Sequence, residues 1–223
     1  MKITKFPSTL ISGDCTTSSL TLDGGSIIDQ CIVTAGERGT FFLGQHLLYV
    51  VLGGSVKLTC GRQSWTVGKN EMILLRRAQS VSYEKQGSEE TGLFESQLFA
   101  INDELLKDFL TSQQVQIPQM KEEYGTQVSP MSDRLVAYCW SLSPYFNDPS
   151  QVNPGLLRLK VMELLYNAMD CSKNIFRQML QSSALSVADI AYSPGFENPT
   201  HFSRIFKQQY GTAPRDAAVR RAI

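Results

Sequence analysis

The sequence predicts an α+β protein, with an N-terminal β-barrel or jelly roll, then α-helices, and a helix-turn-helix at the C-terminus. Short β-branched and aromatic runs separated by turn residues fill roughly the first hundred positions, which is typical of strands. From Asp103 onward, apolar residues recur with a helical period. After Leu185, two short helical patterns flank Gly195.

Nine predicted strands make up the N-terminal part. They are Leu20–Leu22, Ser26–Val33, Gly39–Leu43, His46–Leu52, Ser55–Cys60, Gln63–Val67, Glu71–Leu75, Ser80–Lys85 and Leu93–Ile101. Turn residues such as Gly53-Gly54 and Gly68-Lys69-Asn70 separate them. Each strand needs partners on its edges and one apolar face to bury, and this favours a sandwich or barrel.

The middle of the chain is predicted to be helical. The first helix, Asp103–Leu110, begins with an acid in its first turn, and Ser132–Leu142 follows a polar loop from Gln113 to Pro130. After a second loop, Pro144–Pro154, the longest helix spans Gly155–Asp170 and is apolar on more than one face. Such a helix must be buried against the N-terminal domain, against a second copy of the chain, or against both.

The C-terminal segment carries the capping and turn signals of two helices. Ser186 is a favourable cap for the first helix, and Gly195 supplies the turn. Asn198 before Pro199 starts the second helix. The buried stripe of that second helix, spaced i, i+3 and i+4, is Phe202, Ile205 and Phe206. Its other side chains carry hydroxyl, amide and guanidinium groups, which can meet phosphates and base edges.

This segment resembles the C-terminal signature of AraC/XylS-type transcriptional regulators. The residues that carry the resemblance are Asp189-Ile190-Ala191, Gly195-Phe196, Phe202-Ser203-Arg204, Phe206-Lys207, Tyr210-Gly211 and Ala213-Pro214-Arg215. The resemblance implies binding in the major groove of promoter DNA. By the family pattern, the base contacts are Thr200, Ser203 and Arg204, and the backbone contacts are Asn198, His201 and Lys207.

A second resemblance concerns the predicted strands. The segments Leu47–Val56 and Val67–Arg77 are similar to the cupin-like sensor domain that precedes the DNA-binding part in many such regulators. We therefore expect a cupin-like sensor domain at 1–110, a helical linker and dimerisation region at 111–184, and the helix-turn-helix at 185–223. Because the family has two helix-turn-helix units, the first unit is predicted to be missing and the segment at 185–223 to be the second.

Two functions follow from this organisation. One is a sequence-specific DNA-binding regulator that acts as a homodimer, since one reading helix makes few contacts and a dimer places two of them one turn of DNA apart. The other is a truncated relative that no longer binds DNA alone and acts as an interaction or ligand-sensing protein, by pairing with a full-length regulator. A small-molecule effector or a protein antagonist could act at the N-terminal domain.

No ligand site is assigned from the sequence. Tyr49, Trp65, Arg76, Arg77 and Tyr83 could line a pocket, but aromatic residues at strand spacing are more often core.

Charge is unevenly distributed along a chain whose formal net charge is zero. From Leu156 to Ile223 there are nine Lys and Arg against five Asp and Glu, which leaves twelve against sixteen in the rest. The C-terminal part is thus at +4 and the N-terminal part at −4. This suits a nucleic-acid module joined to an acidic domain, although an ordinary solvated surface has a similar balance.

The residues argue against catalysis and metal binding. The chain has two histidines, His46 and His201, in different predicted domains, whereas a catalytic cupin needs two or three converging imidazoles. We therefore expect no enzyme activity, no metal and no cofactor. Five scattered cysteines without a Cys-x-x-Cys pair favour reduced, buried thiols. With no signal peptide or membrane-spanning pattern, the prediction is a cytoplasmic protein without a membrane partner.

Overall fold

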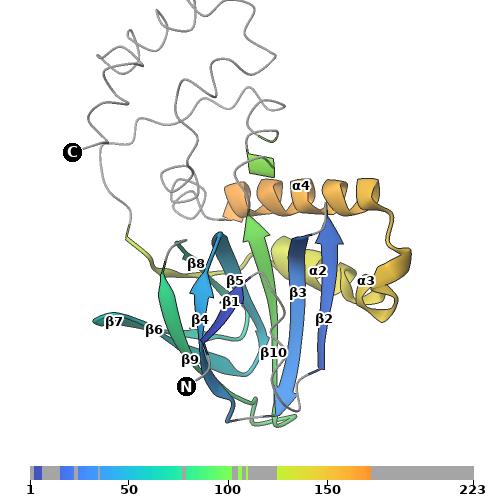
Figure 1. The fold of residues 1–223 in the computed structure, drawn as a ribbon. Helices are drawn as coiled ribbons and strands as arrows, with labels where there is room; N and C mark the ends of the chain where they lie inside the picture. Colours follow the sequence, from blue (N-terminus) through green and yellow to red (C-terminus); the bar gives the residue numbers. More distant parts are fainter. Residues whose placement is uncertain are drawn as a thin grey trace, which may run out of the picture. The chain divides into compact units, whose positions relative to one another are not determined.

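The described elements of the computed structural model form a two-layered β-roll with helices against one of its sheets (Figure 1). The structure describes residues 3–6, 16–22, 25–34, 36–76, 79–101, 105–106, 109 and 125–171. The chain divides into two compact units, Met1–Ile101 with Gly125–Ser182, and Asn102–Tyr124 with Ser183–Ile223. In the second unit, Leu105, Leu106 and Phe109 are helical and buried, as predicted.

The roll consists of a five-stranded and a six-stranded sheet. The five-stranded sheet has the order β1 (Ile3–Phe6), β4 (Arg38–Leu43), β9 (Ser80–Gln86), β6 (Ser55–Cys60) and β7 (Gln63–Gly68). The six-stranded sheet has the order β11 (Val128–Pro130), β8 (Glu71–Leu75), β5 (His46–Gly53), β10 (Leu93–Ile101), β3 (Gly25–Thr34) and β2 (Thr16–Leu22).

The strand pairing is that of a long hairpin rolled up on itself. β6 pairs with β7, β5 with β8, β4 with β9 and β3 with β10, and all four pairs are antiparallel. Successive pairs alternate between the two sheets, so the chain crosses from one sheet to the other at each corner. Nested pairing of this kind defines a jelly roll. The predicted fold class is confirmed for the described part of the chain.

The roll has an apolar core between its sheets and a second one beneath the helices. Leu47, Tyr49 and Val51 of β5 face the core between the sheets. The alternate residues Leu48 and Val50 point the opposite way and are also fully buried. This explains the nearly continuous apolar run of β5, because a strand buried on both faces shows no polar alternation.

The helical layer begins with α2 (Asp133–Ser141), in which the Ser132 hydroxyl accepts a hydrogen bond from the Leu135 N–H at 3.3 Å. After α3 (Ser143–Asn147) and a 3₁₀ turn (Pro149–Gln151), α4 runs over Pro154–Cys171. The core-facing residues of α4 recur with a helical period and are Leu157, Val161, Leu164, Leu165 and Ala168. None of the helices described here has the length and apolarity needed to cross a membrane.

The structure corrects the prediction of a loop over Pro144–Pro154. Two short helical elements occupy most of it, and Pro144 and Pro149 lie in the first turns of α3 and of the 3₁₀ turn. Proline is favourable there because the first helical N–H groups have no intrahelical acceptor. The prolines therefore start helices at this place rather than interrupting them.

Two strands were not predicted. β1 pairs in parallel with β4, with Ile3 opposite Thr40, and β11 pairs with β8, with Val128 opposite Ile73. Both are short, and both are held by partners distant in the sequence. The pattern of their own residues therefore does not reveal them.

Candidate functional site

The DNA-contacting residues predicted from the sequence lie outside the described residues. They are Asn198, Thr200, His201, Ser203, Arg204 and Lys207. Their roles, and the domain limits at 110 and 184, stay predictions. The described unit offers two other places for function, a polar cluster inside the roll and an exposed face of α4.

A small cavity lies inside the roll. It is lined by Cys31 (β3), Phe41 (β4), Tyr49 (β5), Tyr83 and Lys85 (β9) and Leu98 (β10). Measured as the space open to the centre of a water molecule it is about 10 Å³, which holds roughly one water. The two sheets thus meet around a polar spot in an otherwise apolar core.

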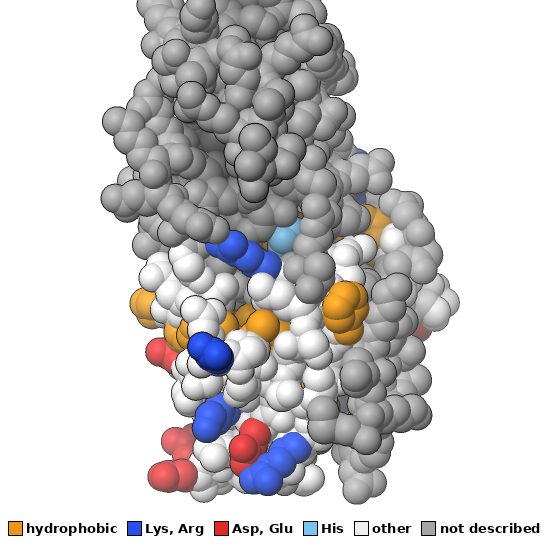
Figure 2. Space-filling view, turned by 60° about the vertical axis from the view of Figure 1, so that its left-hand side comes forward, with side chains coloured by type: hydrophobic (Ala, Val, Ile, Leu, Met, Phe, Trp, Pro, Cys, Tyr) orange, Lys and Arg blue, Asp and Glu red, His pale blue; other side chains and the backbone are white. Residues whose placement is uncertain are grey.

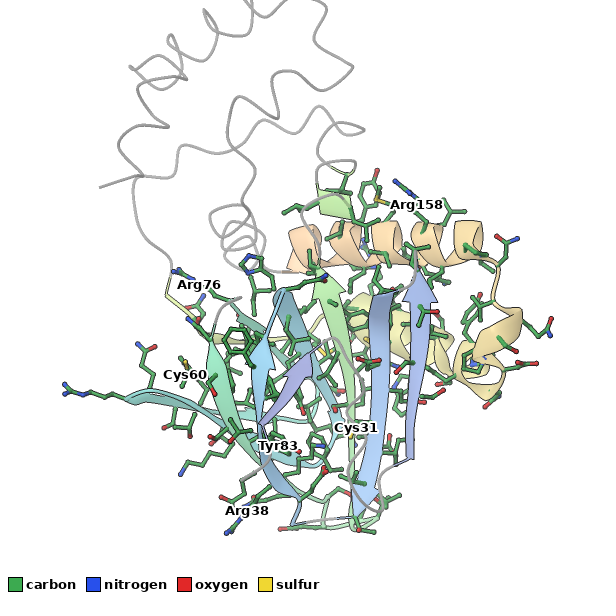
Figure 3. All side chains as sticks on the ribbon, viewed as in Figure 1. Cys31, Arg38, Cys60, Arg76, Tyr83 and Arg158 are labelled. Carbon is green, nitrogen blue, oxygen red and sulfur yellow. The ribbon has the colours of Figure 1, made fainter. Side chains whose placement is uncertain are left out.

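The structure brings together two of the five residues considered as pocket candidates, Tyr49 and Tyr83. Trp65 packs at the edge of the core and donates its indole N–H to the Thr126 carbonyl at 3.1 Å. Arg76 follows β8 and lies near one end of the roll, apart from Cys31 and Tyr83 (Figure 3). Arg77 lies outside the described residues.

Lys85 is the functional group that sequence reasoning missed. Alternate residues of β9 face the interior of the roll, namely Val81, Tyr83 and Lys85. The Lys85 side chain therefore points into the roll, and only 6% of it is exposed. Its Nζ lies 2.5 Å from Glu37 Oε2 and 3.1 Å from Cys31 Sγ. The ammonium also lies 4.9 Å from the centre of the Tyr83 ring and 5.6 Å from that of Phe94. One carboxylate and two aromatic faces thus stabilise the buried charge.

Burial and neighbouring charges change the proton affinities in this cluster. Burial raises the pKa of Tyr49 well above its usual value. Burial alone would lower the pKa of Lys85, but Tyr49, Cys31 and the Glu37 hydrogen bond outweigh it and raise that pKa. Because the Glu37 carboxylate contacts the ammonium directly, Lys85 carries its proton at neutral pH.

The cluster does not resemble a metal site. Among the described residues, no group of three His, Cys, Asp or Glu side chains could hold a metal ion. His46, at the start of β5, lies on the face opposite to Leu47 and Tyr49, so its imidazole points away from the cavity.

We expect the protein to lose stability in alkali. The pKa of the buried Cys139 thiol is raised to about 12, and burial also raises the pKa of Tyr138, as it does for Tyr49. A folded-state pKa above the unfolded value adds stability that is complete below the unfolded pKa and is lost as pH rises through the folded one. The melting temperature should therefore fall above about pH 9, the ordinary thiol value.

The matched variant for this prediction is Cys139→Ala, which removes the one of these three groups with the lowest ordinary pKa. The melting temperature of Cys139→Ala should begin to fall nearer pH 10, the ordinary pKa of tyrosine. Thermal melts followed by circular dichroism between pH 8 and 11 compare the two proteins. If the melting temperatures of the two proteins fall in parallel between pH 9 and 10, the loss of stability in that range does not come from Cys139.

An apolar stripe lies on the outer face of α4. Leu159 is 68% exposed, and Leu156 and Tyr166 are each 40% exposed. Leu159, the half-buried Met162 and Tyr166 are spaced i, i+3 and i+7, so they follow one side of the helix. Arg158 projects from α4 on the side away from the sheets (Figure 3).

The face of the roll in Figure 2 carries basic and acidic side chains side by side. A surface that binds nucleic acid has one predominant sign of charge. The described part of that face therefore does not have the charge pattern of a DNA-binding surface.

Two protein-family profiles match the chain. The profile of the ExsA N-terminal regulatory domain matches residues 46–177, more than half of the chain, and that of a helix-turn-helix domain matches residues 173–220. The first covers β5 to α4, including Tyr49, Lys85 and the exposed face of α4. The second includes all six predicted DNA-contacting residues.

Curated relatives match over the C-terminal segment. The HTH-type transcriptional regulator GlxA of Rhizobium meliloti (strain 1021) is 47% identical over 38 residues, 17% of this chain and 12% of the relative. The HTH-type transcriptional activator RhaS of Escherichia coli is 45% identical over 40 residues, 18% of this chain and 14% of the relative. The matched segment thus spans about an eighth of the length of these relatives.

Solved structures resemble the fold at low sequence identity. ToxT from Vibrio cholerae O395, bound to (E)-4-(8-methylnaphthalen-1-yl)but-3-enoic acid, is 12% identical with a TM-score of 0.45, over 86% of this chain and 98% of that chain. A cupin superfamily protein from Desulfitobacterium hafniense DCB-2 is 14% identical with a TM-score of 0.34, over 42% of this chain and 84% of that chain.

The sequence, the jelly roll and the family profiles agree on the type of protein. The profile match over residues 46–177 covers the strands and helices described above, and the helix-turn-helix match follows it along the chain. The chain therefore belongs to the family of the ExsA N-terminal regulatory domain, joined to a helix-turn-helix of the AraC/XylS type.

Proposed function

We propose that the chain is a sequence-specific DNA-binding transcriptional regulator whose N-terminal roll controls its C-terminal helix-turn-helix. The observation that carries this proposal is the succession, in one chain, of a regulatory-domain match at 46–177 and a helix-turn-helix match at 173–220. The relatives that share the C-terminal segment are named as transcriptional regulators, which supports the proposal.

In this proposal, the helix after Pro199 enters the major groove. Thr200, Ser203 and Arg204 read base edges, while Asn198, His201 and Lys207 contact the phosphate backbone. Arginine is the side chain best suited to a bidentate contact with guanine, so Arg204 is expected to contribute most to sequence preference.

The test measures DNA binding by the full-length chain. Rounds of binding to random-sequence duplexes supply a preferred site, and affinity is then measured against salt concentration. Arg204→Ala should weaken binding to that site by about 1–3 kcal/mol, roughly 5- to 150-fold, and relax its sequence preference. Lys207→Ala should weaken binding to all sequences about equally and reduce the salt slope by about one.

Lys69→Ala is the control, because Lys69 is exposed in the turn between β7 and β8 and has no place in the proposed interface. It should leave both the affinity and the salt slope unchanged. If the chain enriches no sequence at low salt, the regulator hypothesis fails. The truncated interaction protein, acting through a full-length relative, would then be the better account.

We further propose that the regulator is a homodimer and that the stripe of Leu159, Met162 and Tyr166 on α4 forms part of the interface. The same helix face from two copies of the chain can be buried against itself around a two-fold axis. A dimer of this kind also places two DNA-recognition helices at the spacing of adjacent half-sites on DNA. The exposure of Leu159 supports this, since an exposed leucine between other apolar residues gains from burial in a partner.

Leu159→Glu should convert the dimer into a monomer, because a carboxylate at the centre of the interface would be desolvated without a partner. Sedimentation velocity measures the change, and the dissociation constant should rise by about tenfold or more, equivalent to about 1.4 kcal/mol. Thr66→Glu, which adds the same charge on exposed β7, should leave the association unchanged. A wild-type chain that is monomeric at micromolar concentration would contradict the proposal.

The signal that the N-terminal roll receives is proposed to come from a protein antagonist rather than from a ligand inside the roll. The cavity around Tyr83 and Lys85 has room for about one water molecule, and Glu37 already neutralises the buried ammonium. An organic effector in this position would have to displace packed side chains of both sheets. A partner on the surface needs no such change.

A further inference from the structure

We propose that Cys31 and Lys85 form an oxidation-sensitive site, at which hydrogen peroxide drives a covalent sulfur–nitrogen bond between the two side chains. The two residues are 54 positions apart and come from β3 and β9, one in each sheet. Their side chains meet inside the roll with Lys85 Nζ 3.1 Å from Cys31 Sγ. The proposal does not depend on DNA binding.

The surroundings of Cys31 activate its sulfur. A cationic neighbour stabilises the thiolate, which is the form that attacks peroxide. Cys31 is 2% exposed, but it lines the cavity that also contacts Lys85 and Tyr49. The cavity has room for about one water molecule, so the oxidant that reaches this sulfur has to be small, and hydrogen peroxide is the one proposed here.

The first chemical step is a two-electron oxidation of sulfur. The Cys31 thiolate attacks one oxygen of hydrogen peroxide, the O–O bond breaks, and the products are the sulfenic acid of Cys31 and, after one proton is taken up, water. Hydrogen peroxide is the oxidant that is reduced.

The second step joins the residues with loss of water. Lys85 carries its proton at rest, so only the small fraction of molecules in which the Glu37 carboxylate, with Oε2 2.5 Å away, has transiently taken that proton has a reactive amine at Nζ. The lone pair of this amine attacks the sulfur of the sulfenic acid, the S–O bond breaks, and the hydroxyl leaves as water with a proton released by Nζ. The product is a sulfenamide, the class of compound that a sulfenic acid also forms with a backbone nitrogen.

The bond would connect the two sheets of the roll and remove a buried positive charge. A crosslink between residues distant in sequence restricts the unfolded chain, so the oxidised protein should melt at a higher temperature. Since thiols reduce sulfur–nitrogen bonds, the effect should be reversible. The roll would then have two states, set by peroxide and by cellular thiols.

The test uses the purified full-length chain, reduced and freed of reductant. After exposure to hydrogen peroxide and removal of the excess with catalase, tryptic peptides are measured by mass spectrometry. We expect the Cys31 and Lys85 peptides to be joined, with a mass two hydrogens below their sum, and trypsin cleavage after Lys85 to be lost. Dithiothreitol should restore both peptides and the original melting temperature.

Two other cysteines serve as internal controls. Cys60 is partly exposed, and its Sγ lies 3.6 Å from the Gln79 amide oxygen, so it should be oxidised without a crosslink. Cys139 is buried with a pKa raised to about 12, so its thiol should stay unmodified. In Lys85→Arg the positive charge is kept but the guanidinium stays protonated, so Cys31 should be oxidised without any link.

The wild-type measurement decides the proposal, even if the Lys85→Arg variant does not fold. Recovery of Cys31 unmodified, or as sulfinic or sulfonic acid with normal trypsin cleavage after Lys85, would overturn it. A crosslink that forms equally well in Lys85→Arg would also overturn it, because another nitrogen would then be the partner.

Discussion

We expect Gly54→Ala to lower the free energy of unfolding of the roll more than any other glycine-to-alanine substitution in it. Gly54 lies between β5 and β6, at a corner where the chain passes from the six-stranded to the five-stranded sheet. Its φ of +73° is left-handed, and a Cβ there would lie 2.2 Å from the Gln86 carbonyl oxygen. The left-handed conformation costs about 1 kcal/mol for alanine, and a clash with backbone adds about 1–3 kcal/mol.

The matched control is Gly61→Ala, at the tip of the hairpin between β6 and β7. Gly61 has a similar φ of +59°, but a Cβ there would meet nothing within 4 Å. The free energy of unfolding of Gly61→Ala should therefore fall only by the cost of the left-handed conformation, about 1 kcal/mol. Urea denaturation followed by tryptophan fluorescence suits both variants, because Trp65 and Trp140 both belong to the described unit. Equal losses in the two variants would show that the corner adjusts to the methyl group.

Glu37→Ala is expected to lower the free energy of unfolding by about 3 kcal/mol, because it leaves the buried ammonium of Lys85 without its carboxylate. The Glu37 side chain is 22% exposed, so water can partly replace the carboxylate in the variant. The loss of stability should therefore stay near the lower end of what is typical when one partner of a buried ion pair is removed. Adding Lys85→Met should recover most of the loss, since methionine fills similar space without a charge.

An exposed ion pair, formed by the sequence neighbours of Glu37 and Lys85, provides the comparison. Arg38 and Glu84 contact each other, but their side chains are 72% and 37% exposed. Arg38→Ala should therefore change stability by less than about 1 kcal/mol. If Glu37→Ala is as mild as Arg38→Ala, Lys85 must reach water in the absence of Glu37. The proposed closed environment of the Cys31–Lys85 site would then need revision.

The strands were largely predictable because their signals are local. All nine predicted strands are present, and most of their ends agree closely, since turn residues such as Gly53-Gly54 mark them directly in the sequence. The exception is β2, which begins at Thr16 rather than at the predicted Leu20. Ser132 likewise marks the start of α2. The prolines of 144–154 were wrongly predicted to mark a loop. Proline can end one helix or begin the next, and only the neighbouring structure distinguishes the two roles.

The interior site could not be predicted. A lysine that alternates with Val81 and Tyr83 is unusual on an inward face, but the sequence does not say that Glu37 and Cys31 will meet it. The exposed stripe of α4 was predicted only as an excess of apolar residues. The structure assigns Leu157, Val161 and Leu164 to the core and leaves Leu159 outside.

The sequence by itself determined the family, the order of strands and helices, and the helix-turn-helix signature, because each of these rests on residues close together in the chain. Only the tertiary structure decided which of two apolar faces of a strand or helix meets which neighbour, and that a thiol, an ammonium and a phenol share one small cavity. Those contacts join residues dozens of positions apart, and burial turns their weak attraction in water into strong coupling.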